Sequence, residues 1–238
     1  MLITADTLIA DIESFSITDR GRQLALGVSE VGMDCKRCIA RKLALYDKAQ
    51  ETGSWRAQLG TYVHAGLAED FAKKYTKGEL LIEHQLVVHQ YKDFILKGHC
   101  DVFAPNEGHG HTIDWKIVGD DTLSRVQQGK IKRQYIVQGQ LYSLGWELRG
   151  YTVEDVSLMF LPANKGNLRR DAVPYTFKYD RRIAAEALAV IEDMIDLAEA
   201  TSWREVVEAQ RADPGCLSCK SYRHADDHSR NLLVNFKR

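Results

Sequence analysis

The chain lacks a net charge of either sign, a long apolar run and any internal repeat. Its 238 residues carry 32 Lys and Arg against 33 Asp and Glu, a formal net charge of −1. The whole surface therefore does not attract nucleic acid, and any such contact must come from local basic clusters. No apolar stretch approaches the roughly 20 residues of a membrane-spanning helix, so we expect no membrane partner.

A secretion signal is also missing from the start of the sequence. Residues 1–16 contain Asp6, Asp11 and Glu13, where a signal peptide would have a basic start and an unbroken apolar core. We therefore expect a cytoplasmic protein. With 45% hydrophobic residues, the chain can bury a sizeable core, and we expect a single domain over residues 1–238.

Periodicity predicts alternating helices and strands. An i, i+4 apolar stripe from Trp55 to Phe71 predicts a helix that reaches about Tyr75, and Ser29 is a candidate cap for a helical segment that includes residues 35–46. A helix from about residue 126 or 130 to 148 and an amphipathic helix over 181–200 follow. Runs typical of strands lie at 81–89, 94–104, 111–118, 153–161 and 173–179.

Two aspartates fall on neighbouring strands of this pattern. The strand period of two puts Asp114 and Lys116 on one face of residues 113–117 and the apolar side chains on the other. Taken alone, an Asp-x-Lys triplet is more often a solvated face. The preceding strand carries Asp101, however, and the turn-rich residues 105–110 join the two strands as a hairpin. Carboxylates brought so close repel each other, and a hard cation such as Mg²⁺ relieves that repulsion.

Three further polar residues stand around these acids. His64 lies beside the apolar stripe of its helix, where a lone histidine is usually a surface residue, but the downstream acids favour a metal ligand. Gln138 and Tyr142 are four residues apart and so share one helix face. Tyr142 is equally well explained as a core residue, since aromatic residues on helices usually pack.

The ordered pattern of His64, Gly98-x-x-Asp101, Asp114-x-Lys116 and Gln138-x-x-x-Tyr142 resembles the RecB-like branch of the PD-(D/E)XK nuclease superfamily, which includes CRISPR-associated exonucleases. The match spans about residues 29–224. It implies an α/β restriction-endonuclease-like core, with a central mixed sheet flanked by helices. Many members of the superfamily carry glutamate where this chain has Asp114, although aspartate is common in this branch.

The resemblance also implies roles for particular residues. His64, Asp101, Asp114 and the carbonyl of Trp115 would bind Mg²⁺ or Mn²⁺, and Asp101, Asp114 and Lys116 would form the catalytic set. Gln138 and Tyr142 would contact DNA and brace the site. The chain would cleave single-stranded DNA or DNA ends in recombination, repair or phage DNA processing, with recombination or replication proteins as partners, and in the host cytoplasm if it is phage-encoded.

Local basic clusters provide candidate DNA contacts. Residues 123–133 hold four basic and no acidic residues, including Lys130, Lys132 and Arg133, and a second cluster occupies residues 36–42. Either cluster taken alone is more often an ordinary solvated face. Because the first cluster flanks the proposed nuclease motifs, we expect it to contact phosphates.

The cysteines form two pairs of identical spacing, Cys35-x-x-Cys38 and Cys216-x-x-Cys219. In an intracellular protein this pattern favours metal over disulfides, and four thiolates suit tetrahedral zinc or an iron–sulfur cluster. Metal bound from both ends of the chain would join residues 29–50 to residues 202–238 as a clamped subregion.

Several nucleases of the resembled branch hold a 4Fe–4S cluster with one cysteine before the motifs and three after them. The resemblance favours such a cluster here, but the two-and-two arrangement keeps zinc open, and His224 could replace a cysteine. Four free buried thiols are the remaining alternative. Cys100 lies on the strand beside Asp101, and we interpret it as a core residue.

Three functions are compatible with these motifs. An active DNA nuclease is favoured because both acids and Lys116 are present. A catalytically inactive nuclease-fold module that binds DNA or a partner would usually have lost one of them. An unrelated metal-stabilised α/β protein would require four ordered motifs to occur together by accident.

Overall fold

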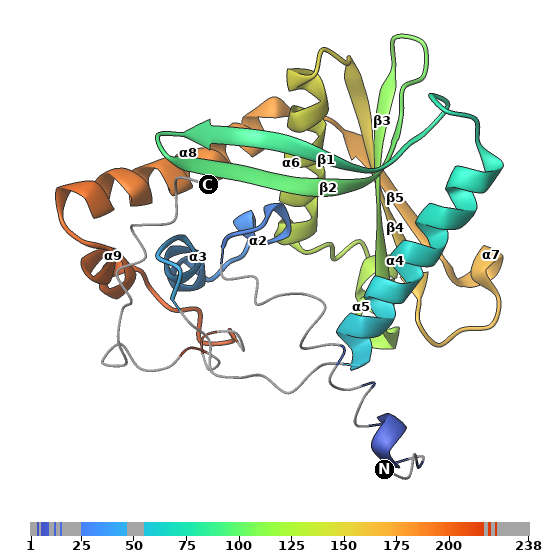
Figure 1. Cartoon of the computed structure of the whole chain (residues 1–238), viewed down its shortest axis with the longest axis horizontal. Helices are drawn as coiled ribbons and strands as arrows, with labels where there is room; N and C mark the ends of the chain where they lie inside the picture. Colours follow the sequence, from blue (N-terminus) through green and yellow to red (C-terminus); the bar gives the residue numbers. More distant parts are fainter. Residues whose placement is uncertain are drawn as a thin grey trace.

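The computed structural model describes residues 4, 6–9, 12, 15, 25–46, 55–216, 219 and 222. Within these residues a five-stranded sheet forms the centre of the molecule (Figure 1). Its strands, which lie in sequence order across the sheet, are β1 (Leu81–Tyr91), β2 (Phe94–Ala104), β3 (Gly110–Val118), β4 (Val153–Pro162) and β5 (Val173–Lys178). All neighbours are antiparallel except β3 and β4. The predicted mixed sheet is therefore confirmed, and so are its five strands.

Helices cover both faces of this sheet. Those described are α2 (Val28–Val31), α3 (Lys36–Leu43), α4 (Trp55–Lys74), α5 (Asp120–Gln127), α6 (Arg133–Leu148), α7 (Leu168–Asp171), α8 (Arg181–Ala200) and α9 (Trp203–Ala209). Because parallel strands need a crossover, α5 and α6 occupy the connection between β3 and β4. α6 packs against the sheet with α8 beside it, and α4 crosses near β1 and β3 (Figure 1).

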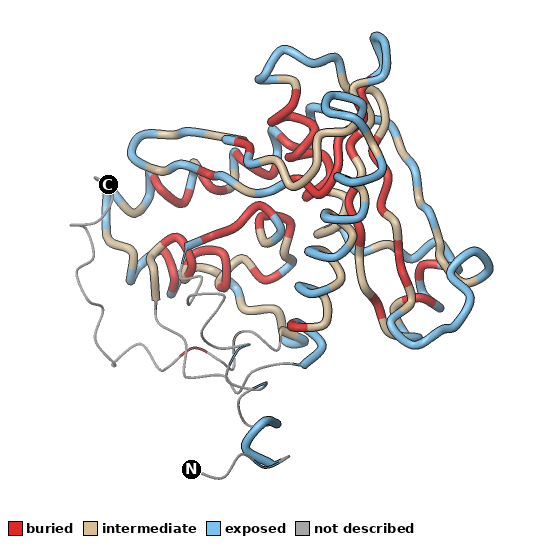
Figure 2. Tube along the Cα trace, turned by 45° about the vertical axis from the view of Figure 1, so that its right-hand side comes forward, coloured by how far each residue is buried: buried red, intermediate tan, exposed pale blue. Residues whose placement is uncertain are grey.

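The alternation of side chains along β4 shows that both faces are buried. Leu158 and Phe160 pack into a cluster that includes residues of α6, whereas Met159 and Leu161 belong to a cluster with Leu67 of α4. A strand covered on both faces carries apolar residues at successive positions. Buried segments accordingly run through the middle of the molecule, and exposed ones follow its outer loops (Figure 2).

Two predicted helix boundaries were wrong. Ser29 does not cap a long helix, because it lies inside the short helix α2, whose N-cap is Gly27; the chain then turns and starts α3 with Cys35 as N-cap. Of the two starts expected for the next helix, residue 126 lies inside a separate helix, α5, whereas residue 130 lies just before α6, which ends at Leu148 as expected. Residues 128–132 separate the two helices. Gly129 in that gap has φ +73°, a conformation that interrupts a right-handed helix.

The predicted helices over 55–75 and 181–200 correspond closely to α4 and α8. α8 buries its apolar side against α6 and α9. None of the described helices is both long and apolar enough to cross a membrane.

Candidate active site

Asp101 lies where two strands of the central sheet separate. β2 and β3 pair from Ala104 to Val102 and no further, so the next position, Asp101 opposite Asp114, is outside the ladder. There the Oδ2 atom of Asp101 accepts the backbone N–H of Trp115 at 2.9 Å. This bond satisfies a buried amide that β2 does not pair and fixes the orientation of the carboxylate.

His64 reaches the same carboxylate from α4. Its Nδ1 atom lies 3.2 Å from Oδ1 of Asp101, and 30% of its side chain is exposed. Burial lowers the pKa of His64, but the hydrogen bond and negative charge of Asp101 outweigh this effect, so the pKa lies above its ordinary value. The structure therefore brings together one nitrogen and one carboxylate of the expected metal ligands.

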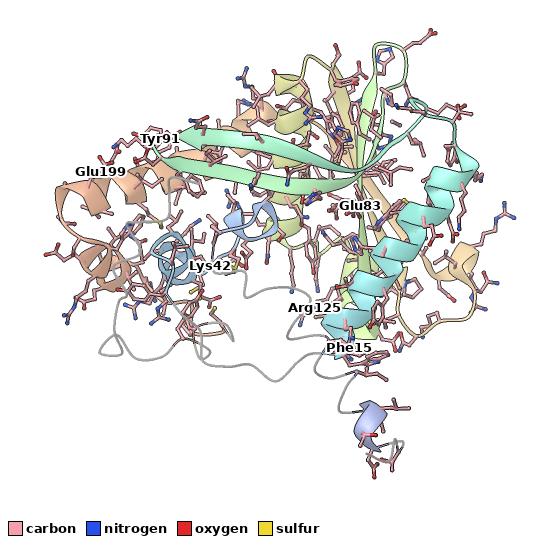
Figure 3. All side chains as sticks on the ribbon, in the orientation of Figure 1. Phe15, Lys42, Glu83, Tyr91, Arg125 and Glu199 are labelled. Carbon is pink, nitrogen blue, oxygen red and sulfur yellow. The ribbon has the colours of Figure 1, made fainter. Side chains whose placement is uncertain are left out.

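Glu83 on β1 completes a group that the sequence motifs did not identify. One ligand atom from each of His64, Glu83 and Asp101 lies within 4.8 Å of the other two. Glu83 has φ +48°, a left-handed conformation that is uncommon for a residue with a side chain. Its side chain lies beside α4 (Figure 3). Glu83 is the single acid of β1, and that sequence signal does not reveal this backbone conformation.

Asp114 forms a second, neighbouring group with Lys116 and Gln138. The Nζ atom of Lys116 lies 2.5 Å from Oδ2 of Asp114 and donates to Oε1 of Gln138 at 2.9 Å. The Nε2 atom of Gln138 donates to Oδ1 of Asp114 at 2.9 Å. Gln138 on α6 thus fixes both charged side chains of β3. Since Gln138 is 6% exposed, the structure favours this bracing role over the expected DNA contact.

The carboxyl groups of the site disfavour each other's charge. Burial raises the pKa of Glu83, and the charge of Asp101 raises it further. Burial also raises the pKa of Asp114 to about 6; Lys116 opposes this effect, and Asp101 adds to it. Oxygen ligands and an imidazole within reach of one ion, with excess negative charge, fit a divalent cation such as Mg²⁺ or Mn²⁺.

Gly98 explains how Tyr142 fits behind the site. A Cβ atom at Gly98 would lie 3.2 Å from the hydroxyl oxygen of Tyr142 and 2.9 Å from a methyl group of Val28. Only glycine allows α2, β2 and α6 to approach this closely. Tyr142 is 5% exposed, so it packs behind the acids, and the DNA contact expected of it does not fit this burial. The charges of Asp114 and Asp101 add to burial in raising its pKa.

The polar groups line an open cleft of about 630 Å³. Glu83, Asp101 and Lys116 contribute to it from the strands, and His64 contributes from α4. The same half of α4 also lines the cleft with the small residues Ala57, Gly60, Thr61 and Ala65 and with one cation, Arg56. These small side chains leave room for a polymer backbone beside the acids.

The predicted basic stretch lies near Lys116 of the candidate active site. Lys130, Lys132 and Arg133 are exposed, and they connect α5 to the start of α6. The ammonium of Lys132 lies 5.8 Å from the ring centroid of Tyr135, and that of Lys116 lies 5.5 Å from the same ring. Exposed Lys132 and partly buried Lys116 therefore lie near a single aromatic ring.

A separate group of cysteines lies at α3, away from the acids in sequence and structure. Cys35, Cys38, Cys216 and Cys219 each place a sulfur within 4.8 Å of the other three, which confirms that both ends of the chain supply one cluster. His224 lies outside the described residues. Cys100 is fully buried in the main core, as its strand position predicted.

Comparison with known proteins supports a nuclease fold. No family model and no curated protein sequence matches the chain. An alkaline exonuclease from Laribacter hongkongensis has a similar structure, with a TM-score of 0.53 and 13% identity over 84% of this chain and 97% of that one. A phage-related exonuclease from Haemophilus somnus gives a TM-score of 0.51 and 14% identity over 77% and 96%. Both of these proteins are described as exonucleases, and at this level of identity the likeness shows a shared fold.

Proposed function

We propose that the chain is a metal-dependent DNA nuclease that hydrolyses phosphodiester bonds. One observation carries the proposal: His64, Glu83 and Asp101 converge beside the Asp114–Lys116 pair in an open cleft. The three acids come from β1, β2 and β3 and the histidine comes from a helix, so the tertiary fold is what brings them together. Mg²⁺ or Mn²⁺ held there would shield phosphate charge and lower the pKa of water.

The residues of the site have distinct roles in this reaction. Asp101 is oriented by the Trp115 N–H, and His64 and Glu83 complete the donor set. Gln138 holds the Lys116 ammonium at a fixed position, where its charge stabilises negative charge that develops on the phosphate. Arg56, which also lines the cleft, offers a second cation for the substrate backbone.

The cleft and the similar structures support DNA as the substrate. An open cleft admits a polymer, and two of the similar structures are described as exonucleases. One of them was crystallised with dAMP. We infer that this chain acts on single-stranded DNA or DNA ends, within recombination, repair or phage DNA processing, and as a member of the RecB-like branch.

A cleavage assay tests the proposal. The full chain is incubated with end-labelled single- and double-stranded DNA and with Mg²⁺, Mn²⁺ or excess EDTA. We expect cleavage only with metal, and a loss of about 100-fold or more in Asp101→Asn and Lys116→Met, as when one charge-stabilising group is removed. Asp93→Asn, the same change in the exposed turn between β1 and β2, should cleave like wild type.

A mobility-shift assay alongside the cleavage assay distinguishes the nuclease from an inactive module. If the chain binds DNA but leaves it intact with every metal, the nuclease proposal is contradicted and a DNA-binding module is supported. Equal cleavage by wild type and both site variants would also overturn the proposal.

A further inference from the structure

The four clustered cysteines have a spacing that identifies the kind of metal they hold. The sulfur of Cys219 lies 3.3 Å from that of Cys35 and 3.3 Å from that of Cys38, and the sulfurs of Cys38 and Cys216 are 3.5 Å apart. These separations are too long for disulfides, whose sulfurs are about 2.05 Å apart. They also leave no space between the four sulfurs for more than one atom.

A single tetrahedral zinc ion requires nearly this arrangement. Zinc–thiolate bonds are about 2.3 Å long, and the edge of a regular tetrahedron with that radius is about 3.8 Å. The three sulfur–sulfur distances given above are slightly shorter than this edge, and all four sulfurs are within 4.8 Å of one another. Small side-chain rotations would bring them all onto one ion.

A 4Fe–4S cluster does not fit the same sulfurs. Each thiolate then binds a different iron, so the four thiolates must surround four irons and four sulfides. Each iron is displaced from the centre of the cluster, and its thiolate lies one metal–sulfur bond farther out. The four thiolates are therefore farther apart than four thiolates around a single ion. The sulfurs would have to spread well beyond 4.8 Å, which requires the two cysteine segments to move apart.

A 2Fe–2S cluster is also disfavoured, because it divides four cysteines into two separated pairs. The contacts run without a break from Cys35 to Cys219, from Cys219 to Cys38 and from Cys38 to Cys216. Any division of the four residues into two pairs is crossed by at least one of these short contacts. We therefore propose that the cysteines hold one zinc ion, and not the iron–sulfur cluster that the family resemblance favours.

The surroundings supply what a zinc–thiolate centre needs. Four thiolates around a dication leave negative charge, and hydrogen-bond donors and cations near the ligands offset it. Arg41 lies at this position, with Nη1 donating to the Cys219 carbonyl at 3.4 Å and its guanidinium 5.0 Å from the centroid of the Tyr222 ring. The buried Nε atom of Arg41 has no acceptor within the part of the chain that the structure describes, so it is available to a thiolate.

The site is structural, because protein ligands fill all four positions and leave none for substrate. Cys35 and Cys38 are 3% and 1% exposed, at the N-terminus of α3. The other two follow α9, and Arg37 of α3 donates to the carbonyl of Gln210 just beyond that helix at 2.8 Å. Zinc would lock a contact between segments that are more than 170 residues apart in sequence.

Metal analysis of the wild-type chain tests the proposal without any variant. The full chain is purified anaerobically from cells supplied with both zinc and iron, so that an oxygen-sensitive cluster is preserved. We expect about one zinc per chain and neither acid-labile sulfide nor a broad visible absorption. Stoichiometric iron and sulfide would overturn the proposal, and so would a folded chain without metal.

Cobalt substitution and three variants locate the ion. Co²⁺ in a four-thiolate site should give the intense visible d–d bands of tetrahedral coordination. Cys219→Ser should weaken these bands and lower the zinc content, whereas Cys100→Ser, the same change outside the cluster, should retain both. Asp114→Asn should also retain zinc, because the proposed ligands are the cysteines and not the nuclease acids. Loss of zinc in Asp114→Asn with retention in Cys219→Ser would place the ion at the acids and refute the cysteine site.

Discussion

Glu83 brings its carboxylate to the site through an unusual backbone conformation. A left-handed φ of +48° costs about 1–2 kcal/mol for a residue with a Cβ, and such strain persists where the surrounding structure enforces it. Both neighbours of Glu83 are held in the β1–β2 ladder, since Ile82 pairs with Val102 and His84 with Cys100. The strain fits a residue that binds a ligand.

We predict that Glu83→Gln weakens metal activation more than it changes the fold. The substitution keeps the shape but removes one of the charges near Asp101, so the Mg²⁺ or Mn²⁺ concentration for half-maximal cleavage should rise about 10-fold or more, by analogy with losses around metal sites. Titration of cleavage rate against metal measures this shift. Glu107→Gln, in the exposed turn before β3, is the matched control, and an unchanged midpoint in Glu83→Gln would exclude it as a ligand.

A second prediction concerns the buried charge pair. Asp114 is 1% exposed and the Lys116 side chain 15%, so Lys116→Met leaves a buried carboxylate without its partner, at a cost of about 3–5 kcal/mol in unfolding free energy. Adding Asp114→Asn removes that charge and should recover most of the loss. Chemical denaturation with EDTA present measures both variants. If the double variant is no more stable than Lys116→Met, the two charges are not coupled.

At the scale of elements, the strands were predictable and the details of the site were not. The period-two pattern of residues 113–117 and the turn-rich stretch 105–110 predicted the hairpin that places Asp101 near Asp114, and β2 and β3 confirm it. The separation of these strands beyond Val102 depends on tertiary packing, so it left no periodic signal. The same holds for the conformation of Glu83.

The helices differ from their predictions for local reasons. The long α4 was predicted from its i, i+4 stripe, yet Trp55 is 57% exposed and only the C-terminal part of the stripe, with Leu67 and Phe71, packs on the sheet. The division into α2 and α3 was missed because neither helix has a side-chain N-cap hydrogen bond. Cap residues are the main sequence signal for a helix start.

The close packing of β2 against α6 gives a prediction at this scale. Gly98→Ala would place a methyl group against Val28 and Tyr142, and overpacking of this kind costs about 1–3 kcal/mol. Gly66→Ala on α4 meets nothing within 4 Å and should instead stabilise the chain by about 0.5–1 kcal/mol through helix propensity. Thermal or chemical unfolding compares the two. Equal effects of both substitutions would show that the glycine at 98 is not required by packing.

For the whole molecule, charge distribution matters more than net charge. The formal net charge of −1 gives no overall attraction to DNA, whereas exposed Lys130, Lys132 and Arg133 lie between α5 and α6. Other basic residues are paired with acids, as Lys92 is with Asp196 and Glu199 at the far end of the β1–β2 hairpin. A cation that is already paired locally releases few counterions when DNA binds, so it contributes little to affinity.

This difference can be measured through salt dependence. In an Asp114→Asn background, which blocks cleavage, we expect Lys130→Gln/Lys132→Gln/Arg133→Gln to lower the magnitude of the slope of log K against log salt for single-stranded DNA by about 2, from a contribution of roughly 0.7 per phosphate contact. The control replaces three paired cations, Lys92, Arg181 and Arg182, by Gln. Both triple variants lose three positive charges, so a long-range effect of net charge would change both slopes equally. A reduced slope in the first variant alone would show that DNA crosses the surface between α5 and α6 on its way to the acids.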